Sequence, residues 1–182
     1  PVVSLLADMG KNNIDYNGYM KLSRIIYDAG MDNDIIDDQS ILDAKVQNGR
    51  IEVRGNKYQA LVFGPEKTIR LAVLKKVLEF VQNGGVVLFY GELPRASVEN
   101  GKQDSHVLSL FEQLLGTSSG EMKRQKTIEH NFKNGGYTVF VPELSELLPS
   151  LLSTHIDRDF IGSGGDVFLS HRRIDSINVY LV

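Results

Sequence analysis

Three charged residues in this sequence, Asp8, Glu92 and Arg95, stand just after apolar runs and are its first candidates for a binding site. Asp8 follows the run at 1–7, and the other two follow the run at 86–90. If these runs are parallel strands, their carboxyl ends meet at one edge of the sheet, where open α/β folds bind ligands. A polar rim at that edge could hold carbohydrate or another small ligand, whereas the competing interpretation is an ordinary polar surface loop.

The segment from Gly116 to Gly120, with the sequence GTSSG, matches the G-x-S-x-G pattern around the nucleophilic serine of many hydrolases. That pattern needs a strand before it and a helix after it, but a helical pattern precedes it here. We therefore interpret this segment as a glycine that ends a helix, followed by a loop. The sequence contains no cysteine, which excludes disulfides, thiolate nucleophiles and sulfur ligands for metals.

Neither the acidic cluster near residue 35 nor the histidines have the spacing of a metal site. An EF-hand calcium loop that began at Asp32 would need an oxygen ligand and then glycine where this sequence has Ile36 and Asp37. The glycine-rich segment 162–165 leads into a strand pattern, whereas phosphate-binding loops lead into a helix. We expect no metal and no cofactor. The acidic cluster is Asp32, Asp34, Asp37 and Asp38, and the histidines are His106, His130, His155 and His171.

Length and charge narrow the class of protein. The 182 residues, 42% of them hydrophobic, suffice for one domain with a full core, or for one domain with an appendage. A net charge of -3 argues against nucleic acid as a partner, because phosphate binding needs clustered lysine and arginine. No apolar run approaches the roughly 20 residues of a membrane span. The sequence starts at Pro1 without a methionine, and we expect it to be a piece of a longer polypeptide.

The segment 58–97 must position the candidate rim, because it alone predicts a strand, a helix and a second strand. Its apolar runs at 59–63 and 86–90 are ended by glycine, which is typical of strands that are buried on both faces. Between them, the spacing of apolar residues predicts an amphipathic helix over 68–82. Two strands joined by a helix run parallel, so the loops 64–67 and 91–97 both lie at the carboxyl edge.

The rest of the chain up to residue 156 predicts further strands and helices of the same α/β domain. Their order predicts a three-layer sandwich of the flavodoxin-like type with a mostly parallel sheet. We interpret 117–134 as a loop with at most one irregular strand or helix. The other expected elements are a strand at 1–7, a helix at 18–29 capped by Asn17 and ended by Gly30, a strand at 34–37, a helical turn at 40–44, a hairpin at 46–53 around Asn48-Gly49, a helix at 105–115, a strand at 137–141 and a helix at 143–152.

Residues 157–182 form a second region in this interpretation. The turn-rich segment 157–165 predicts a linker, and the segments 167–170 and 177–182 predict two strands joined around 173–175. We expect these strands to lead into a following β domain, or to dock with it.

Three stretches of the sequence, at 12–65, 74–97 and 168–182, together resemble one region of a known family. This is the region after the catalytic barrel in large bacterial α-L-rhamnosidase-like glycoside hydrolases, namely family 106 and its relatives. There, a class I glutamine-amidotransferase-like domain is followed by a strand with a His-Arg pair and a strand with a tyrosine. His171, Arg172 and Tyr180 match that pattern. The resemblance implies that the catalytic carboxylates and bound calcium belong to the barrel, so none is carried over here.

The resemblance also predicts what the chain does. Amidotransfer needs a cysteine nucleophile after the strand that here precedes Glu92, and the chain has none. The first hypothesis is a non-catalytic structural domain of a periplasmic or secreted glycoside hydrolase that acts on plant or pectic polysaccharide. Its partners would be the other domains of that enzyme, with His171 and Arg172 at the interface. The alternative is a carbohydrate or small-ligand module that uses Asp8, Glu92 and Arg95, and an independent hydrolase is a third hypothesis.

Overall fold

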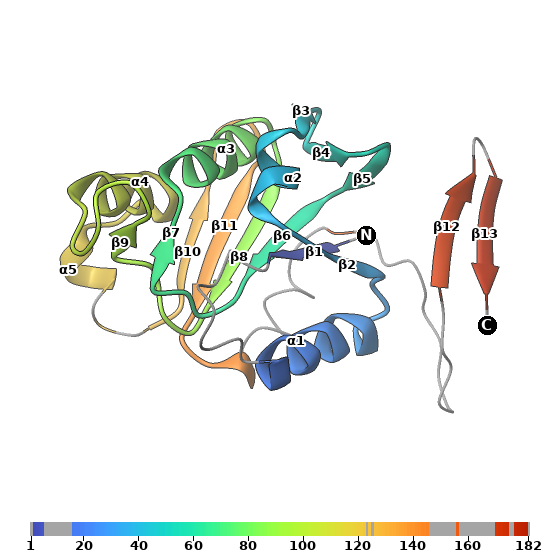
Figure 1. Cartoon of the computed structure of the whole chain (residues 1–182), viewed down its shortest axis with the longest axis horizontal. Helices are drawn as coiled ribbons and strands as arrows, with labels where there is room; N and C mark the ends of the chain where they lie inside the picture. The colour runs from blue at the N-terminus through green and yellow to red at the C-terminus, as the bar shows by residue number, and fades with distance from the viewer. Residues whose placement is uncertain are drawn as a thin grey trace.

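A six-stranded sheet forms the centre of the protein in the computed structural model (Figure 1). The structure describes residues 2–5, 16–122, 124, 126–145, 156, 170–174 and 177–181. The strands lie in the order β10-β11-β8-β6-β1-β2, and every neighbouring pair is parallel except the antiparallel pair of β10 and β11. Their bounds are β1 Val2–Leu5, β2 Asn33–Ile36, β6 Ala60–Phe63, β8 Val86–Tyr90, β10 Ile128–Asn131 and β11 Tyr137–Val141.

The two central strands, β6 and β8, consist of apolar residues without interruption. Every residue of β6 is buried, and so are the last four residues of β8. A strand with helices on both faces buries side chains in both directions, which explains the continuous rather than alternating pattern. Leu61 pairs with Val87 in a parallel register. The predicted strands at 59–63 and 86–90 and their parallel arrangement are therefore confirmed.

Helices cover both faces of this sheet (Figure 1). On one face, α3 and α4 pack with Leu61 and Phe63 of β6. On the other face, α1 packs with Ala60 and Val62 of the same strand. These helices and the mostly parallel sheet confirm the predicted α/β class. The helix bounds are α1 Tyr16–Asp28, α2 Asp38–Leu42, α3 Leu71–Gln82 and α4 Ser105–Leu115.

The helix α3 begins at Leu71, so the predicted start at Thr68 is wrong. The residues Thr68–Ile69 instead form the short strand β7, which pairs with β9 at Ala96–Ser97. The backbone N–H of Leu71 donates a hydrogen bond to both carboxylate oxygens of Glu99, at 3.1 Å each. A carboxylate at a helix N-terminus pairs with an otherwise unpaired N–H. Its negative charge also interacts favourably with the positive end of the helix dipole. A segment 28 residues further along the chain therefore helps to fix where this helix begins.

Two helix starts near the N-terminus also differ from the prediction. The helix α1 begins at Tyr16, so Asn17 lies inside it and is not its N-cap. Gly30 has φ of 79° and follows the end of the helix, as predicted. Asp37 belongs to no strand but is the N-cap of α2, where its carboxylate accepts a hydrogen bond from the backbone N–H of Ser40 at 2.8 Å. That hydrogen bond lowers the pKa of Asp37.

The predicted hairpin around Asn48-Gly49 is confirmed as the antiparallel pair β3 and β4. Both turn residues have positive φ, 51° and 68°, as a two-residue hairpin turn requires. A third strand, β5, continues this small sheet and was not predicted. The backbone N–H of Gly49 donates to the carbonyl of Asn83 at 2.7 Å, which ties the turn to the end of α3. The bounds are β3 Lys45–Gln47, β4 Arg50–Val53 and β5 Asn56–Tyr58.

The segment 117–134 contains more structure than the predicted loop. Gly116 ends α4 in the left-handed conformation, with φ of 61°. The short helix α5 at Ser119–Met122 follows, and then β10 forms the antiparallel edge of the large sheet. Because the helix α4 precedes the GTSSG segment, its interpretation as a helix end rather than a nucleophile turn is confirmed.

The last described elements are the antiparallel strands β12 at Ser170–Ile174 and β13 at Ile177–Leu181. They pair with each other in a two-stranded sheet of their own (Figure 1). The predicted strand from residue 177 is confirmed, but the connection predicted at 173–175 is wrong, because Arg173 pairs with Asn178 inside the sheet. The predicted linker at 157–165 and most of the helix predicted at 143–152 lie outside the described residues.

Candidate functional site

A pocket of about 360 Å³ lies next to the carboxyl end of β8, between the loop that follows this strand and the helices α4 and α5. The loop contributes residues 91–95, and β11 contributes Phe140 to the wall. Apolar and polar side chains both line the pocket. The apolar ones are Leu93, Pro94, Leu108, Phe111, Met122 and Phe140, and the polar ones are Glu92, Arg95, Gln103 and Ser119.

The loop after β8 is held in place by contacts with the ends of neighbouring strands. Gly91 has φ of 80°, and its backbone N–H donates to the carbonyl of Val141 at 2.9 Å. A Cβ atom at Gly91 would lie 2.9 Å from Cβ of Pro65, so the glycine permits both the turn and this close approach. The carbonyl of Lys67 accepts hydrogen bonds from the backbone N–H groups of Arg95 and Ala96, at 3.3 Å each. The loops after β6 and β8 therefore support one another at the carboxyl edge.

The apolar wall of the pocket continues into the core. Phe111 and Phe140 are 1% and 2% exposed. The ring of Phe111 meets the ring of Phe89 edge to face, with centroids 5.2 Å apart, and Phe89 stacks on Phe63 at 5.0 Å. Aromatic pairs in these arrangements add to the stability gained from burial. The pocket therefore has a fixed apolar floor.

The polar side chains of the pocket stand at its rim. Glu92, Arg95 and Gln103 are exposed, and Ser119 is half-buried. The backbone N–H of Ser119 donates to a carboxylate oxygen of Glu112 at 2.9 Å. Within the part of the chain that the structure describes, none of the four rim side chains takes part in a hydrogen bond or an ion pair. Their donors and acceptors are therefore available to a ligand.

The structure brings together two of the three residues that the sequence singled out. Glu92 and Arg95 both line the pocket, whereas Asp8 lies outside the described residues. The sequence did not point to Gln103 or Ser119, which come from segments before and after α4. No local signal pointed to either residue, because both reach the pocket through the packing of α4 and α5.

A second polar cluster surrounds Asp104, but its geometry is that of a turn and helix cap. The Asp104 carboxylate accepts hydrogen bonds from the hydroxyl of Ser97 and the side-chain amide of Asn100, and from the backbone N–H of His106 at 2.9 Å. A catalytic triad needs histidine between serine and aspartate, whereas here the aspartate lies between the other two. These hydrogen bonds, first that from Ser97, hold the pKa of Asp104 well below its usual range.

Replacement of this aspartate, Asp104→Asn, is expected to make the free energy of unfolding less dependent on pH. The pKa of Asp104 is lower in the folded state than its ordinary value of 3.8, so the carboxylate stabilises the fold above that pH. This contribution is lost as the pH falls below that value. Urea unfolding at about pH 6 and about pH 3 measures the difference.

The native chain should lose more stability between these two pH values than Asp104→Asn does. The matched control is Glu129→Gln, which changes an exposed carboxylate on β10 and should keep the native pH dependence. Equal losses in the native chain and in Asp104→Asn would contradict the prediction.

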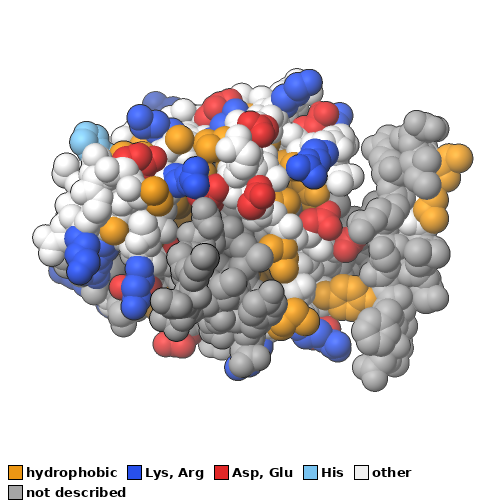
Figure 2. All heavy atoms as spheres, in the orientation of Figure 1, with side chains coloured by type: hydrophobic (Ala, Val, Ile, Leu, Met, Phe, Trp, Pro, Cys, Tyr) orange, Lys and Arg blue, Asp and Glu red, His pale blue; other side chains and the backbone are white. Residues whose placement is uncertain are grey.

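The remaining candidates from the sequence do not form a second site within the described residues. No group of three or more His, Asp or Glu side chains in the described ranges is placed to hold a metal ion. His171 and Arg172 lie on β12, where His171 pairs with Tyr180 across the two-stranded sheet. Among the helices described, none is both long and apolar enough to cross a membrane. On the face seen in Figure 2, acidic and basic side chains are interspersed.

Comparison with known proteins gives a family and a set of similar structures. The chain is similar to Gan42B, a GH42 beta-galactosidase from G. stearothermophilus, with a TM-score of 0.50 and 10% identity over 94% of this chain and 31% of that chain. A catalytic mutant of Gan42B gives a TM-score of 0.47 and 9% identity over the same shares. No curated protein matches the chain. The model of one family, described as alpha-L-rhamnosidase, matches residues 18–182. The chain therefore belongs to glycoside hydrolase family 106, the alpha-L-rhamnosidase family.

Proposed function

We propose that this chain is a non-catalytic accessory domain of a multidomain glycoside hydrolase of the rhamnosidase type. The observation that carries this proposal is the single carboxylate, Glu92, among the described residues that line the pocket. Most glycoside hydrolases use two carboxyl groups, about 5–5.5 Å apart in retaining enzymes and about 6.5–9.5 Å apart in inverting ones. One acts as the acid and the other as nucleophile or base. The described residues of the pocket therefore supply one carboxyl group and not the pair.

We further propose that the domain is flavodoxin-like and related to class I glutamine amidotransferases. The parallel strands lie in the order β2-β1-β6-β8-β11, which corresponds to the order 2-1-3-4-5 of flavodoxin-like sheets. In such a domain the nucleophilic cysteine would follow the strand that is β8 here. Gly91 and Glu92 occupy that position, and the chain contains no cysteine. The same fold would then serve a structural role.

In this proposal the domain supports the catalytic barrel or a β domain that follows it. The match of residues 18–182 to a glycoside hydrolase family supports such a multidomain parent. The paired strands β12 and β13 form a two-stranded sheet, and isolated sheets of this size are marginally stable in water. His171 and Arg172 on β12 would contact the neighbouring domain. The parent enzyme would be periplasmic or secreted and act on plant or pectic polysaccharide.

An assay of α-L-rhamnoside hydrolysis tests the non-catalytic role. The purified chain, its Glu92→Gln variant and the full-length enzyme are compared on a chromogenic aryl α-L-rhamnoside. We expect activity from the full-length enzyme and none above background from the chain. Turnover by the chain that is abolished in Glu92→Gln would overturn the proposal, because that result would make the pocket an active site.

A further inference from the structure

The rim of the pocket beside β8 combines one acidic and one basic side chain. Glu92 offers only hydrogen-bond acceptors, and Arg95 offers only donors. Because the rim carries one charge of each sign, it has no net charge that would favour an anionic or a cationic ligand. A neutral ligand with several hydroxyls satisfies both side chains, because each hydroxyl can donate to the carboxylate and accept from the guanidinium. Gln103 and Ser119 can each donate and accept as well.

The floor of the pocket is apolar, in contrast to its polar rim. Leu108 and Met122 are partly buried, and Phe111 and Phe140 complete the surface beneath the rim. The pocket thus combines apolar surface with polar groups that can fix the orientation of a ligand, as sites for small molecules do. A sugar ring presents C–H groups on its faces and hydroxyls around its edge. Its faces therefore suit the floor, and its edge suits the rim.

The volume of the pocket matches that of a small ligand. At ~30 Å³ for each water in the liquid, 360 Å³ corresponds to about a dozen waters. A single hexose has about a dozen non-hydrogen atoms, and each water has one. One hexose therefore needs about the space of these waters. The volume lies at the lower end of the range of about 300–1,000 Å³ for small-molecule pockets.

We propose that this pocket binds one neutral sugar unit, with the hydroxyls held by Glu92 and Arg95 and the ring faces on the apolar floor. This adds a ligand to the accessory role and requires no catalysis. A failure of binding therefore leaves the proposed function standing, and a positive hydrolysis assay would not by itself test binding.

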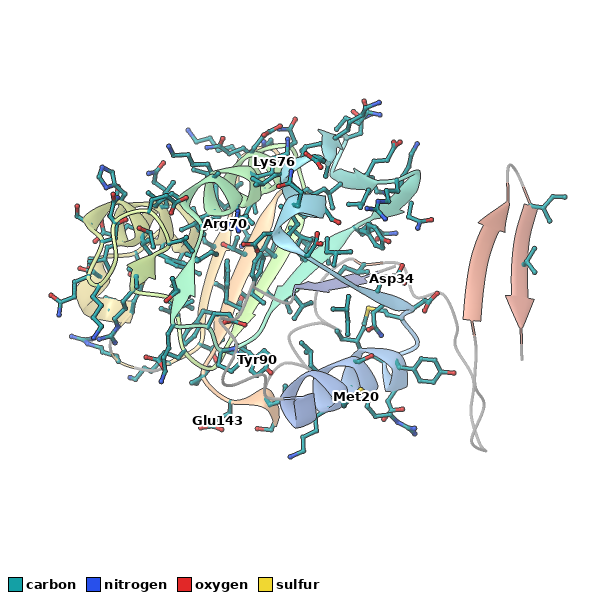
Figure 3. All side chains as sticks on the ribbon, in the orientation of Figure 1. Met20, Asp34, Arg70, Lys76, Tyr90 and Glu143 are labelled. Atoms are coloured by element: carbon teal, nitrogen blue, oxygen red, sulfur yellow. The ribbon has the colours of Figure 1, made fainter. Side chains whose placement is uncertain are left out.

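Methionine methyl NMR gives a direct test, because two methionines provide a reporter and an internal control. Met122 lines the pocket, whereas Met20 lies on α1, on the opposite face of the sheet from α4, and is 64% exposed (Figure 3). The full 182-residue chain, labelled with ¹³C at the methionine methyl groups, is titrated with L-rhamnose, D-galactose and D-galacturonate. Met122→Leu assigns the reporter signal. A neutral sugar should shift the Met122 signal saturably and leave the Met20 signal unchanged.

Variants of the rim separate specific binding from weak surface effects. Arg95→Ala and Glu92→Gln should each raise the dissociation constant about tenfold or more, because each removes charged hydrogen bonds to the sugar. The matched controls are Lys75→Ala on α3 and Glu129→Gln on β10, both exposed and both outside the pocket. They should bind like the native chain. Circular dichroism confirms that each variant is folded.

Three results would overturn the proposal. The first is no saturable shift of Met122 with either neutral sugar. The second is a stronger response to D-galacturonate than to the neutral sugars, which would make the site one for anions. The third is unchanged affinity in both Arg95→Ala and Glu92→Gln, which would place the sugar elsewhere.

Discussion

Replacing Gly136 with alanine is expected to destabilise the chain by about 3 kcal/mol or more, the upper part of the range for overpacked cores. Gly136 is buried just before β11. A Cβ atom there would lie 1.9 Å from the carbonyl oxygen of Val81 in α3. That oxygen belongs to the backbone, so the clash is relieved only if the helix or the strand moves. Urea unfolding measures the loss as a lower midpoint of the transition.

The matched control for this variant is Gly120→Ala in α5. A Cβ atom at Gly120 would lie 3.7 Å from the hydroxyl of Ser118, which is an ordinary contact. Alanine is also the better helix former, by up to about 1 kcal/mol. The control should therefore be as stable as the native chain or slightly more stable. A similar loss for Gly136→Ala and Gly120→Ala would contradict the packing of α3 against the start of β11.

The second large effect is expected for Phe89→Ala, which should cost about 3–5 kcal/mol. Phe89 is 2% exposed on the central strand β8. Its ring lies between those of Phe63 and Phe111, at centroid distances of 5.0 Å and 5.2 Å. Removing the ring leaves a cavity in addition to the lost apolar burial. Thermal and urea unfolding of the native chain and the variant measure the loss of stability.

Two further variants make this prediction specific. Phe89→Leu keeps part of the buried volume and should lose less stability than Phe89→Ala. Phe132→Ala removes a ring that is only partly buried beside His130, with centroids 4.4 Å apart, and should also lose less. If Phe132→Ala were as damaging as Phe89→Ala, the centre of the core would not be at β8.

The sequence predicted the strands and helices whose signal is local. The runs at β6 and β8 are apolar throughout because both faces of the sheet are covered, and glycine marks where each ends. The turn at Asn48-Gly49 was also predictable from its own residues, because asparagine and glycine are the residue types that most readily adopt positive φ.

The errors occurred where distant segments determine the structure. The start of α3 depends on Glu99 and on the pairing of β7 with β9, which lie far apart in the sequence. The edge strand β10 has a mixed composition and forms because β11 offers it a partner. Periodicity within one window contains no information on such pairings.

Some residues of the candidate site could be predicted from the sequence, and others could not. Glu92 and Arg95 could be predicted because they directly follow an apolar strand whose carboxyl end was evident. Gln103, Ser119 and Met122 could not, because they reach the pocket only through the packing of α4 and α5 against the sheet edge. That packing is a tertiary property, which the pattern within one segment of the sequence does not contain.

The proposed structural role of this domain is tested most directly by heat inactivation of the full-length enzyme that carries Gly136→Ala. A loss of about 3 kcal/mol in a domain of this size lowers its unfolding temperature by roughly 6–12 °C. If the domain supports the catalytic barrel, rhamnosidase activity should be lost at a correspondingly lower temperature, together with the unfolding of the domain. Unchanged inactivation of the enzyme while this domain unfolds early would contradict the account.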